Sequence, residues 1–204
     1  MLPGRRMMGK IFEIMGRSSC GKDTIYKRLL ERGNVNLNKV IIYTTRPMRE
    51  KEVDGVQYYF CSIDRYEKFR EERKIIEERT YNTMYGPWHY FTVDDGQIDL
   101  KKGNYLIIGT IDMYVSFKEY FGEESVVPLM ISVDDGGIMQ RAMKRELKQE
   151  IPKYDEMCRR FLADKADYSD ERLQYGGITR TFDNNGDVEL CIEEIERFIE
   201  EQTK

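Results

Sequence analysis

The sequence predicts a single α/β domain in which a parallel sheet is flanked by helices. Apolar, β-prone runs alternate with helical patterns along most of the 204 residues, as is typical of parallel sheets covered on both faces. Near the amino-terminal end, a strand pattern, a glycine-rich loop and a helix pattern follow one another. The composition, 40% hydrophobic and 34% charged, indicates one globular domain with small inserted subdomains.

The amino-terminal part predicts a strand, a helix and a second strand. Ile11–Met15 is a short apolar run that ends before a glycine, which indicates a buried strand. Apolar residues at helical spacing predict a helix over residues 23–32, and Gly33 is a suitable stop. Residues 40–43 form the second β-prone run.

The middle of the chain has a different texture from the strand–helix–strand units. Residues 44–60 combine a proline, many charges and an Asp-Gly pair before an aromatic run, which predicts a loop and a turn followed by a strand. A short helix is expected over 63–72 and a strand over 74–77. Residues 81–91 are rich in aromatic side chains. We therefore expect an inserted subdomain here.

The carboxyl-terminal part returns to alternating strands and helices. The two most apolar runs predict buried strands, and an amphipathic pattern closes the chain. The expected strands are 105–111, 126–133 and 178–182, and the expected helices are 138–148, 155–170 and 188–199.

Composition and charge exclude several classes of protein. A net charge of −4 and a pI near 5.3 argue against a general nucleic-acid binder. Four widely spaced cysteines and one histidine argue against a zinc site or a disulfide framework. No apolar run approaches the roughly 20 residues that span a bilayer, and the basic first ten residues lack the apolar segment of a secretory signal. We expect a cytoplasmic protein that binds neither nucleic acid nor membranes, with Met1, Met7 or Met8 as its start.

The loop between the first strand and the first helix has the pattern GxxxxGK. Its glycines let successive backbone N–H groups point inward around phosphate oxygens, and the following helix adds its positive end. Lys22 is expected to reach the β- and γ-phosphates. A strand–helix turn without a ligand is the alternative interpretation. The expected ATP-binding residues are Gly16, Arg17, Ser18, Ser19, Cys20, Gly21, Lys22, Asp23 and Thr24.

The position after the lysine departs from the usual pattern. A serine or threonine hydroxyl commonly binds Mg²⁺ there, whereas this chain has Asp23 followed by Thr24. A carboxylate contacts Mg²⁺ directly or through water. Asp23 and Thr24 are therefore the candidate metal ligands, with Mg²⁺ as the expected cofactor of ATP.

A second set of polar and basic residues lies in residues 44–60, downstream of the phosphate loop. Two arginines, Arg46 and Arg49, and the hydroxyl of Tyr58 are spaced so that they can surround one phosphate dianion. A surface loop with scattered charge is the alternative for this stretch.

The segment that carries Arg46, Arg49 and Tyr58, TTRPMREKEVDGVQYYF, closely resembles the acceptor-binding stretch of guanylate kinases. With the phosphate loop upstream, the resemblance covers nearly the whole chain. It implies a P-loop kinase fold with a small mixed α/β acceptor-binding subdomain over about 44–91 and a helical lid over about 136–159. The core would comprise about 8–43, 92–135 and 160–204.

The resemblance also implies how GMP is held. Arg46, Arg49 and Tyr58 would hold its phosphate, and Tyr85 of a Met-Tyr-Gly run would complete that cluster. Glu77 and Asp112 would accept hydrogen bonds from guanine N1–H and the 2-amino group, which selects guanine over adenine. The spacing to Tyr85 is about one residue shorter than the family pattern, so Glu78 is an alternative to Glu77 in this role. Glu77 could also be an exposed carboxylate at a strand end without a ligand.

Three positions depart from the family pattern. Pro87 stands where a hydroxyl residue is usual, Ile42 where a small residue is usual, and Thr110 where the family commonly has an acid. Because that acid is missing where the phosphate loop gains Asp23, we hypothesise that Asp23 takes over part of the metal-organising role.

Cations are locally in excess over residues 141–160, and this segment resembles the mobile lid of nucleotide kinases. Lys22, Arg145, Arg160 and Arg141 are therefore the expected catalytic groups, since phosphoryl transfer needs positioning and charge neutralisation more than covalent chemistry. No general base is required, because the acceptor phosphate is already an anion. A solvated helix face is the alternative.

The resemblance implies ATP-dependent phosphorylation of GMP or dGMP, with ATP and GMP as the partners. One competing function is a kinase for another phosphorylated acceptor such as ribose 1,5-bisphosphate, whose kinases also resemble this chain in the aspartate after the lysine. The other is a guanylate-kinase-like module that binds a partner without catalysis. Retention of Lys22 and the two loop glycines argues against the second.

Overall fold

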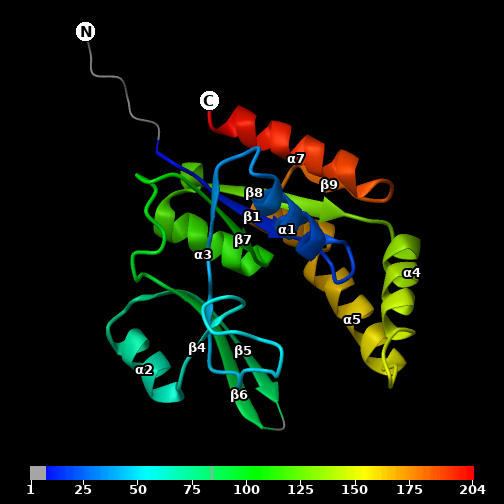
Figure 1. Ribbon diagram of the computed structural model, residues 1–204, viewed down its shortest axis with the longest axis horizontal. Coiled ribbons are helices and arrows are strands. Elements are labelled where there is room, and N and C mark those ends of the chain that lie inside the picture. The colour runs from blue at the N-terminus through cyan, green and yellow to red at the C-terminus, as the bar shows by residue number, and fades with distance from the viewer. Residues whose placement is uncertain (1–7, 84) are drawn as a thin grey trace.

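The structure, a computed structural model, describes residues 8–83 and 85–204 and contains two sheets (Figure 1). The larger sheet has five parallel strands in the order β2-β7-β1-β8-β9. Because the strands are parallel, the loops that follow β1, β7 and β8 emerge at one edge of this sheet. Its strands are β1 (Ile11–Met15), β2 (Leu37–Lys39), β7 (Asn104–Ile108), β8 (Val126–Ser132) and β9 (Thr181–Asp183).

Helices cover both faces of this sheet. On one face, α1 (Lys22–Arg32) and α7 (Val188–Gln202) pack together, and their buried side chains share a core with Phe12 and Ile14 of β1. On the other face, α3 (Ile111–Phe121) and α6 (Asp170–Gly176) pack over Ile11 and Met15. The two cores alternate along β1, as expected for a pleated strand buried on both sides.

This alternation puts one charged residue into the core. Glu13 lies between Phe12 and Ile14 in the sequence and therefore faces the same side as Ile11 and Met15, beneath α3. Its side chain has no solvent exposure.

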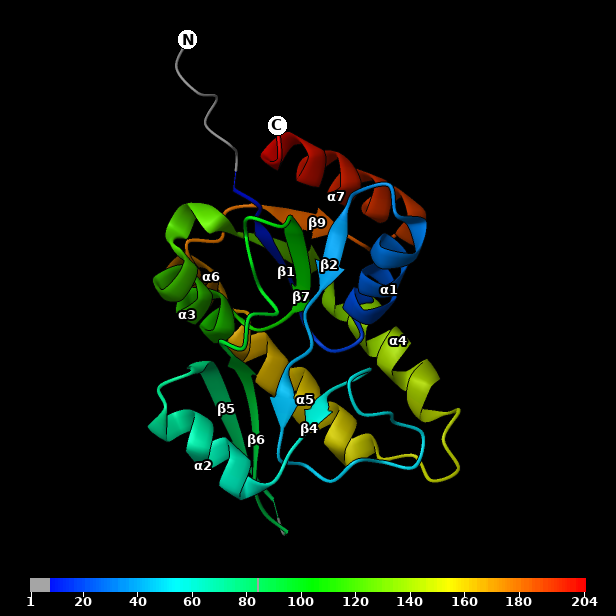
Figure 2. The same cartoon turned by 60° about the vertical axis from the view of Figure 1, so that its left-hand side comes forward.

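The second sheet forms the inserted subdomain, below the central sheet in Figure 2. Its strand order is β4-β3-β6-β5, with an antiparallel β5–β6 hairpin. A small aromatic core joins the sheet to its helix, which lies on one face. The elements are β3 (Tyr43–Thr44), β4 (Tyr59–Phe60), α2 (Ile63–Glu71), β5 (Ile75–Thr83) and β6 (Gly86–Val93).

A pair of helices projects from the same end of the central sheet as this subdomain (Figures 1 and 2). The single-turn helix η1 (Glu123–Ser125) leads into β8, and α4 (Asp135–Glu146) follows β8 directly. A short connection then leads to α5 (Tyr154–Asp167), which returns to the central sheet, where Phe161 packs against the core. We refer to α4 and α5 as the helical arm.

The predicted fold class is confirmed, but several element boundaries differ. The strand expected over 40–43 is two strands of different sheets, β2 and β3, with Val40 buried between them. The strand expected over 105–111 ends at Ile108, and α3 begins at Ile111. The helix α3 was not predicted, because the apolar run continues from a buried strand into a buried helix face and its periodicity does not separate the two.

Other boundaries moved in the same way. The helix expected over 155–170 is divided between α5 and α6, the strand expected over 178–182 begins at Thr181, and the strand expected over 74–77 extends to Thr83. Among the described residues, no helix is both long and apolar enough to cross a membrane. Of the three candidate starts, Met1 and Met7 lie outside the described residues.

Candidate active site

The glycine-rich loop from Gly16 to Lys22 curls between β1 and α1. Gly16 has φ +147° and Gly21 has φ +96°, and Ser19 also adopts a positive φ of 66°. A Cβ at Gly16 would lie 2.7 Å from Ile131 O, and one at Gly21 would lie 2.5 Å from Asn184 Nδ2. Both glycines are therefore required by backbone conformation and by close approach.

Two side chains from other parts of the chain donate hydrogen bonds to Cys20 O of the loop. Asn184, which is buried, donates to this oxygen through Nδ2 at 2.7 Å. Arg141 of α4 approaches the same oxygen with Nη1 at 3.4 Å and donates from Nη2 to Asn184 O at 2.6 Å. The structure thus brings Arg141 to the loop, but with its guanidinium engaged by backbone carbonyls.

Cationic side chains surround the mouth of the loop. Lys22 Nζ lies 3.5 Å from Arg17 O, folded back over the loop. The Arg17 guanidinium donates to Asp135 at 2.6 Å and lies 4.8 Å from the Phe161 ring centroid. Asp135 also pairs with Lys165 at 2.7 Å, and the two cations lower its pKa. Through Asp135 and Phe161, Arg17 thus connects the loop to both helices of the helical arm.

A carboxylate of α5 also contacts the loop backbone. Asp164 Oδ2 accepts a hydrogen bond from the Ser18 N–H. Backbone N–H groups of such a loop are the donors that bind phosphate oxygens. In this state, one of them is therefore occupied by an anion from the protein itself.

The two candidate metal ligands lie in the first turn of α1. Asp23 and Thr24 are both exposed, and each offers oxygen to a cation beside a bound nucleotide. In the described part of the chain, no group of three or more His, Cys, Asp or Glu is arranged to hold a metal ion.

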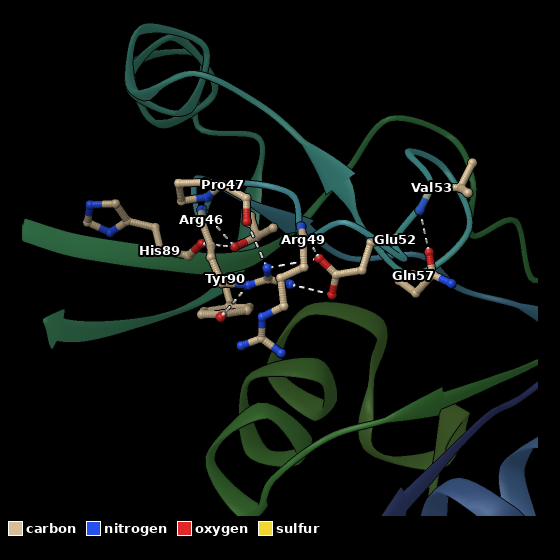
Figure 3. Close-up of polar contacts among 9 residues, drawn as sticks. Arg46, Pro47, Arg49, Glu52, Val53, Gln57, His89 and Tyr90 are labelled. Atoms are coloured by element: carbon tan, nitrogen blue, oxygen red, sulfur yellow. Dashed lines mark hydrogen bonds and ion pairs between the residues drawn. The ribbon is translucent and has the colours of Figure 1, made fainter. Parts of the chain in front are cut away.

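In the inserted subdomain, Arg46 is the most deeply buried cation (Figure 3), with a relative exposure of 3%. Its Nη1 and Nη2 donate to the two oxygens of Glu52 at 2.9 and 2.8 Å, and its Nε donates to Tyr90 Oη at 3.1 Å. The bidentate contact with Arg46 lowers the pKa of Glu52 to about 2. Glu52 therefore occupies the guanidinium face that a phosphate would take.

Arg49 and Tyr58 lie next to this pair. The Arg49 backbone N–H donates to Glu52 at 2.8 Å, while its guanidinium extends away from the carboxylate and is exposed (Figure 3). The Tyr58 ring centroid is 5.4 Å from the Arg46 guanidinium and 5.6 Å from the Tyr90 ring. The structure thus brings Arg46, Arg49 and Tyr58 together and adds Tyr90.

Glu77 lies on the face of β5 that points toward the central sheet. It is buried, accepts from Thr92 Oγ1 at 2.9 Å and lies 3.4 Å from Arg79 Nε, and burial raises its pKa. Glu78 lies on the opposite face, where it accepts from Tyr66 Oη of α2 at 2.6 Å. Of the two glutamates considered for the base, only Glu77 faces α3 and the central sheet.

Four other expected site residues are not brought to these clusters. Asp112, in the first turn of α3, is exposed and pairs with Arg172 at 2.6 Å. Tyr85 lies in the β5–β6 turn with a relative exposure of 79%; its neighbour Met84 lies outside the described residues. Arg145 and Arg160 are exposed and pair with glutamates of their own helices, Glu146 at 3.8 Å and Glu156 at 2.8 Å.

Two of the three departures from the family pattern, Thr110 and Ile42, have structural roles. Thr110 caps α3, accepting from the Met113 N–H at 3.4 Å. Ile42 packs against the core beneath α3. Pro87 lies in β6 and is exposed.

Sequence reasoning missed four residues that support the two clusters, namely Glu52, Tyr90, Arg79 and Asp164. Glu52 lies within the acceptor segment, and an acid six residues after Arg46 could have been tested as its partner. The other three carry no motif, and Tyr90 and Asp164 are far in the sequence from Arg46 and Ser18, which they contact. Only the fold brings them to the site.

Comparison with known proteins gives one consistent family. The guanylate kinase family model matches residues 8–91. A guanylate kinase of Caldanaerobacter subterraneus subsp. tengcongensis is 30% identical over 197 residues, which are 95% of this chain and 88% of that protein. A guanylate kinase of Porphyromonas gingivalis is 25% identical over 194 residues, 94% of this chain and 97% of that protein.

A solved structure is similar over nearly the whole chain. The crystal structure of guanylate kinase from Anaplasma phagocytophilum matches with a TM-score of 0.62 at 20% identity, covering 96% of this chain and 87% of that one. At this identity, the match supports the shared fold.

Proposed function

The chain belongs to the guanylate kinase family, and we propose that it transfers the terminal phosphoryl group of ATP to GMP. The observation that carries this proposal is the buried Arg46 with Arg49, Tyr58 and Tyr90 around it. A buried guanidinium beside tyrosine hydroxyls suits a phosphate dianion. The phosphate loop that would hold ATP is complete in Gly16, Gly21 and Lys22.

In this proposal, each part of the chain has one role. The loop N–H groups and Lys22 bind the phosphates of ATP, and Arg46, Arg49 and Tyr58 orient the phosphate of GMP for in-line attack. Residues 44–91 would act as the GMP-binding subdomain and 136–159 as the lid. Because Arg17 belongs to the loop and Arg141 contacts Cys20 O within it, we assign both to the ATP side. Arg145 and Arg160 would reach the transferring group only if their pairs with Glu146 and Glu156 break on lid closure.

Asp23 and Thr24 would hold Mg²⁺ bound to ATP, directly or through water. When bound, Mg²⁺ neutralises charge on the phosphate oxygens. Asp23 itself adds a negative charge beside the nucleotide, so ATP binding in the absence of a divalent cation should be disfavoured.

A coupled assay of ADP release tests the proposal with GMP, dGMP, AMP and ribose 1,5-bisphosphate as acceptors and Mg²⁺–ATP as donor. We expect turnover with GMP or dGMP and little with the other two. If turnover were fastest with ribose 1,5-bisphosphate, that compound and not GMP would be the acceptor substrate. Tight GMP binding without turnover of any acceptor would instead indicate a binding module.

A further inference from the structure

Glu13 is a buried ionisable residue that has no role in the proposed reaction so far. It lies in the middle of β1, its side chain is completely buried, and neither of its carboxylate oxygens has a hydrogen-bond partner among residues 8–83 and 85–204. An ionised carboxylate without donors is strongly disfavoured inside a protein. Such a group therefore holds a proton in this state, or meets donors that a ligand supplies.

The surroundings of Glu13 connect it to the inserted subdomain. A Cβ at Gly109 would overlap Glu13 Oε1 and would lie 2.8 Å from Met113 Sδ. Arg79 of β5 approaches the same sulfur with Nη2 at 3.9 Å. Burial first, and then the neighbouring Glu77, raise the pKa of Glu13 well above its usual range, while Arg79 opposes the rise. Glu13, Glu77 and Arg79 thus form one cluster between β1 and β5.

The cluster has unused hydrogen-bonding capacity of both kinds. Glu13 offers two acceptor oxygens, and Arg79 Nε is a buried donor with no well-aligned partner, although it lies 3.4 Å from Glu77 Oε2. Because Arg79 can balance the charge of only one of the two carboxylates, the other holds a proton or meets donors from a ligand. A neutral ligand that presents adjacent N–H donors and one acceptor would satisfy all three residues.

The cluster continues the surface that carries the phosphate-binding residues. In the β5–β6 register, Arg79 lies opposite Tyr90 and Glu77 lies opposite Thr92. Directly opposite residues project from the same face of a sheet. Tyr90 accepts from Arg46, so a nucleotide whose phosphate meets Arg46 would extend its base along this face toward Glu77 and Glu13.

We propose that Glu13 is a specificity-determining residue, whose carboxylate accepts hydrogen bonds from N1–H and the 2-amino group of guanine. Glu77 lies beside it, and Arg79 donates to guanine O6. The proposal rests on the proposed function, since it takes GMP as the acceptor. It assigns to Glu13 the role that the family resemblance gives to Asp112, which here pairs with Arg172 at the surface.

Arg79 covers the cluster, with its side chain 23% exposed while that of Glu77 is 3% exposed. Guanine therefore reaches Glu13 only after the Arg79 side chain moves aside. A hydrogen bond from the Arg79 guanidinium to guanine O6 would then keep this side chain beside the base.

Titration calorimetry of GMP and IMP binding tests the proposal, because IMP lacks only the 2-amino group. The full-length chain is compared with Glu13→Gln, Asp112→Asn and Arg79→Gln. We expect the preference for GMP over IMP to fall about tenfold or more in Glu13→Gln, the loss of one charge-assisted hydrogen bond. Arg79→Gln should weaken GMP and IMP alike, because both carry O6. Glu119→Gln, an exposed acid of α3, is the control.

A preference that is unchanged in Glu13→Gln and collapses in Asp112→Asn would overturn the proposal. A wild-type chain that does not bind GMP would overturn it as well. Binding of GMP without turnover would refute only the kinase assignment, since the affinities still measure recognition. If thermal unfolding shows that Glu13→Gln is not folded, Glu13→Asp replaces it; this variant withdraws the carboxylate by one methylene and should weaken GMP binding more than IMP binding.

Discussion

At the scale of single residues, the proposed acceptor site already contains a carboxylate of the protein itself. The Arg46 guanidinium is bound by Glu52 on one face and by Tyr90 at Nε. The bidentate contact with Arg46 stabilises the Glu52 carboxylate and lowers its pKa to about 2. A GMP phosphate must therefore compete with Glu52 or use the exposed Arg49. We therefore expect Arg49, which is exposed, to contact the GMP phosphate first and Arg46 to orient it once Glu52 is displaced.

Replacing Arg46 by lysine should weaken GMP binding more than it slows transfer. Lysine keeps the charge but loses the forked donors that match a phosphate or a carboxylate. We expect KM for GMP to rise roughly 10- to 100-fold, the effect of one or two charge-assisted hydrogen bonds. Steady-state kinetics with varied GMP measures this, with Arg70→Lys on exposed α2 as the matched control. An unchanged KM would show that Arg46 serves only to hold Glu52.

Asp23 should determine how the protein depends on Mg²⁺. If its carboxylate organises the metal, Asp23→Ser should lose activity at limiting Mg²⁺ and recover part of it in excess Mg²⁺. The measurement is the ADP-release rate against Mg²⁺ concentration at fixed ATP. Asp170→Ser, a first-turn acid of α6 on another face, is the control. Unchanged or higher activity at all Mg²⁺ concentrations would remove Asp23 from the metal site.

At the scale of elements, the phosphate loop is shaped by segments distant in sequence. Asn184, after β9, holds Cys20 O from below, and Arg141 of α4 joins it. From α5, Asp164 accepts from the Ser18 N–H, and Lys165 pairs with Asp135. Movement of the helical arm therefore changes the contacts of the loop directly.

The Asp164 contact should compete with ATP. A carboxylate on a loop N–H both occupies a donor and repels the nucleotide phosphates. We expect Asp164→Asn to lower KM for ATP several-fold, since the negative charge is lost while the size of the side chain is kept. Kinetics with varied ATP measures the effect, with the exposed Asp167→Asn on the same helix as control. A higher KM for ATP would mean that Asp164 orders the loop rather than blocking it.

At the scale of the whole molecule, the inserted subdomain and the central sheet share a buried charged interface. Glu13 of β1 faces Glu77 and Arg79 of β5, with Tyr114 of α3 nearby. Most interfaces between such units are apolar or solvated. This one retains two carboxylates whose pKa values are raised by burial, so its stability depends on protonation.

The stability of the unliganded protein should fall as pH rises because of Glu13. A raised native pKa means that the native state binds a proton that the unfolded state releases above its ordinary pKa of about 4.5. The stabilisation is therefore full below that pH and is lost as pH rises toward the native pKa. Thermal unfolding at several pH values from 5 to 8 measures it.

Glu13→Gln should remove this component of the pH dependence, and the difference between wild type and variant isolates it from other titrating groups. Glu119→Gln should follow the wild type. Parallel curves for wild type and Glu13→Gln would show that the Glu13 carboxyl keeps an ordinary pKa.

The sequence by itself determined the class of fold and the glycine-rich loop between β1 and α1, and it predicted the acceptor segment. These depend on local patterns: strand and helix periodicity, glycines that a tight loop requires at Gly16 and Gly21, and arginines spaced around one anion. The fold class could be predicted because the patterns that specify it are local in the sequence.

Tertiary structure alone decided which groups surround those motifs. Glu13 was part of an apolar run and carried no signal, yet the pleat of β1 directs it beneath α3 and next to β5. Asp112 fitted a motif, but the start of α3 at Ile111 directs it to Arg172 at the surface. A side chain's direction depends on the register and boundaries of elements that are distant in sequence, and local patterns do not specify these.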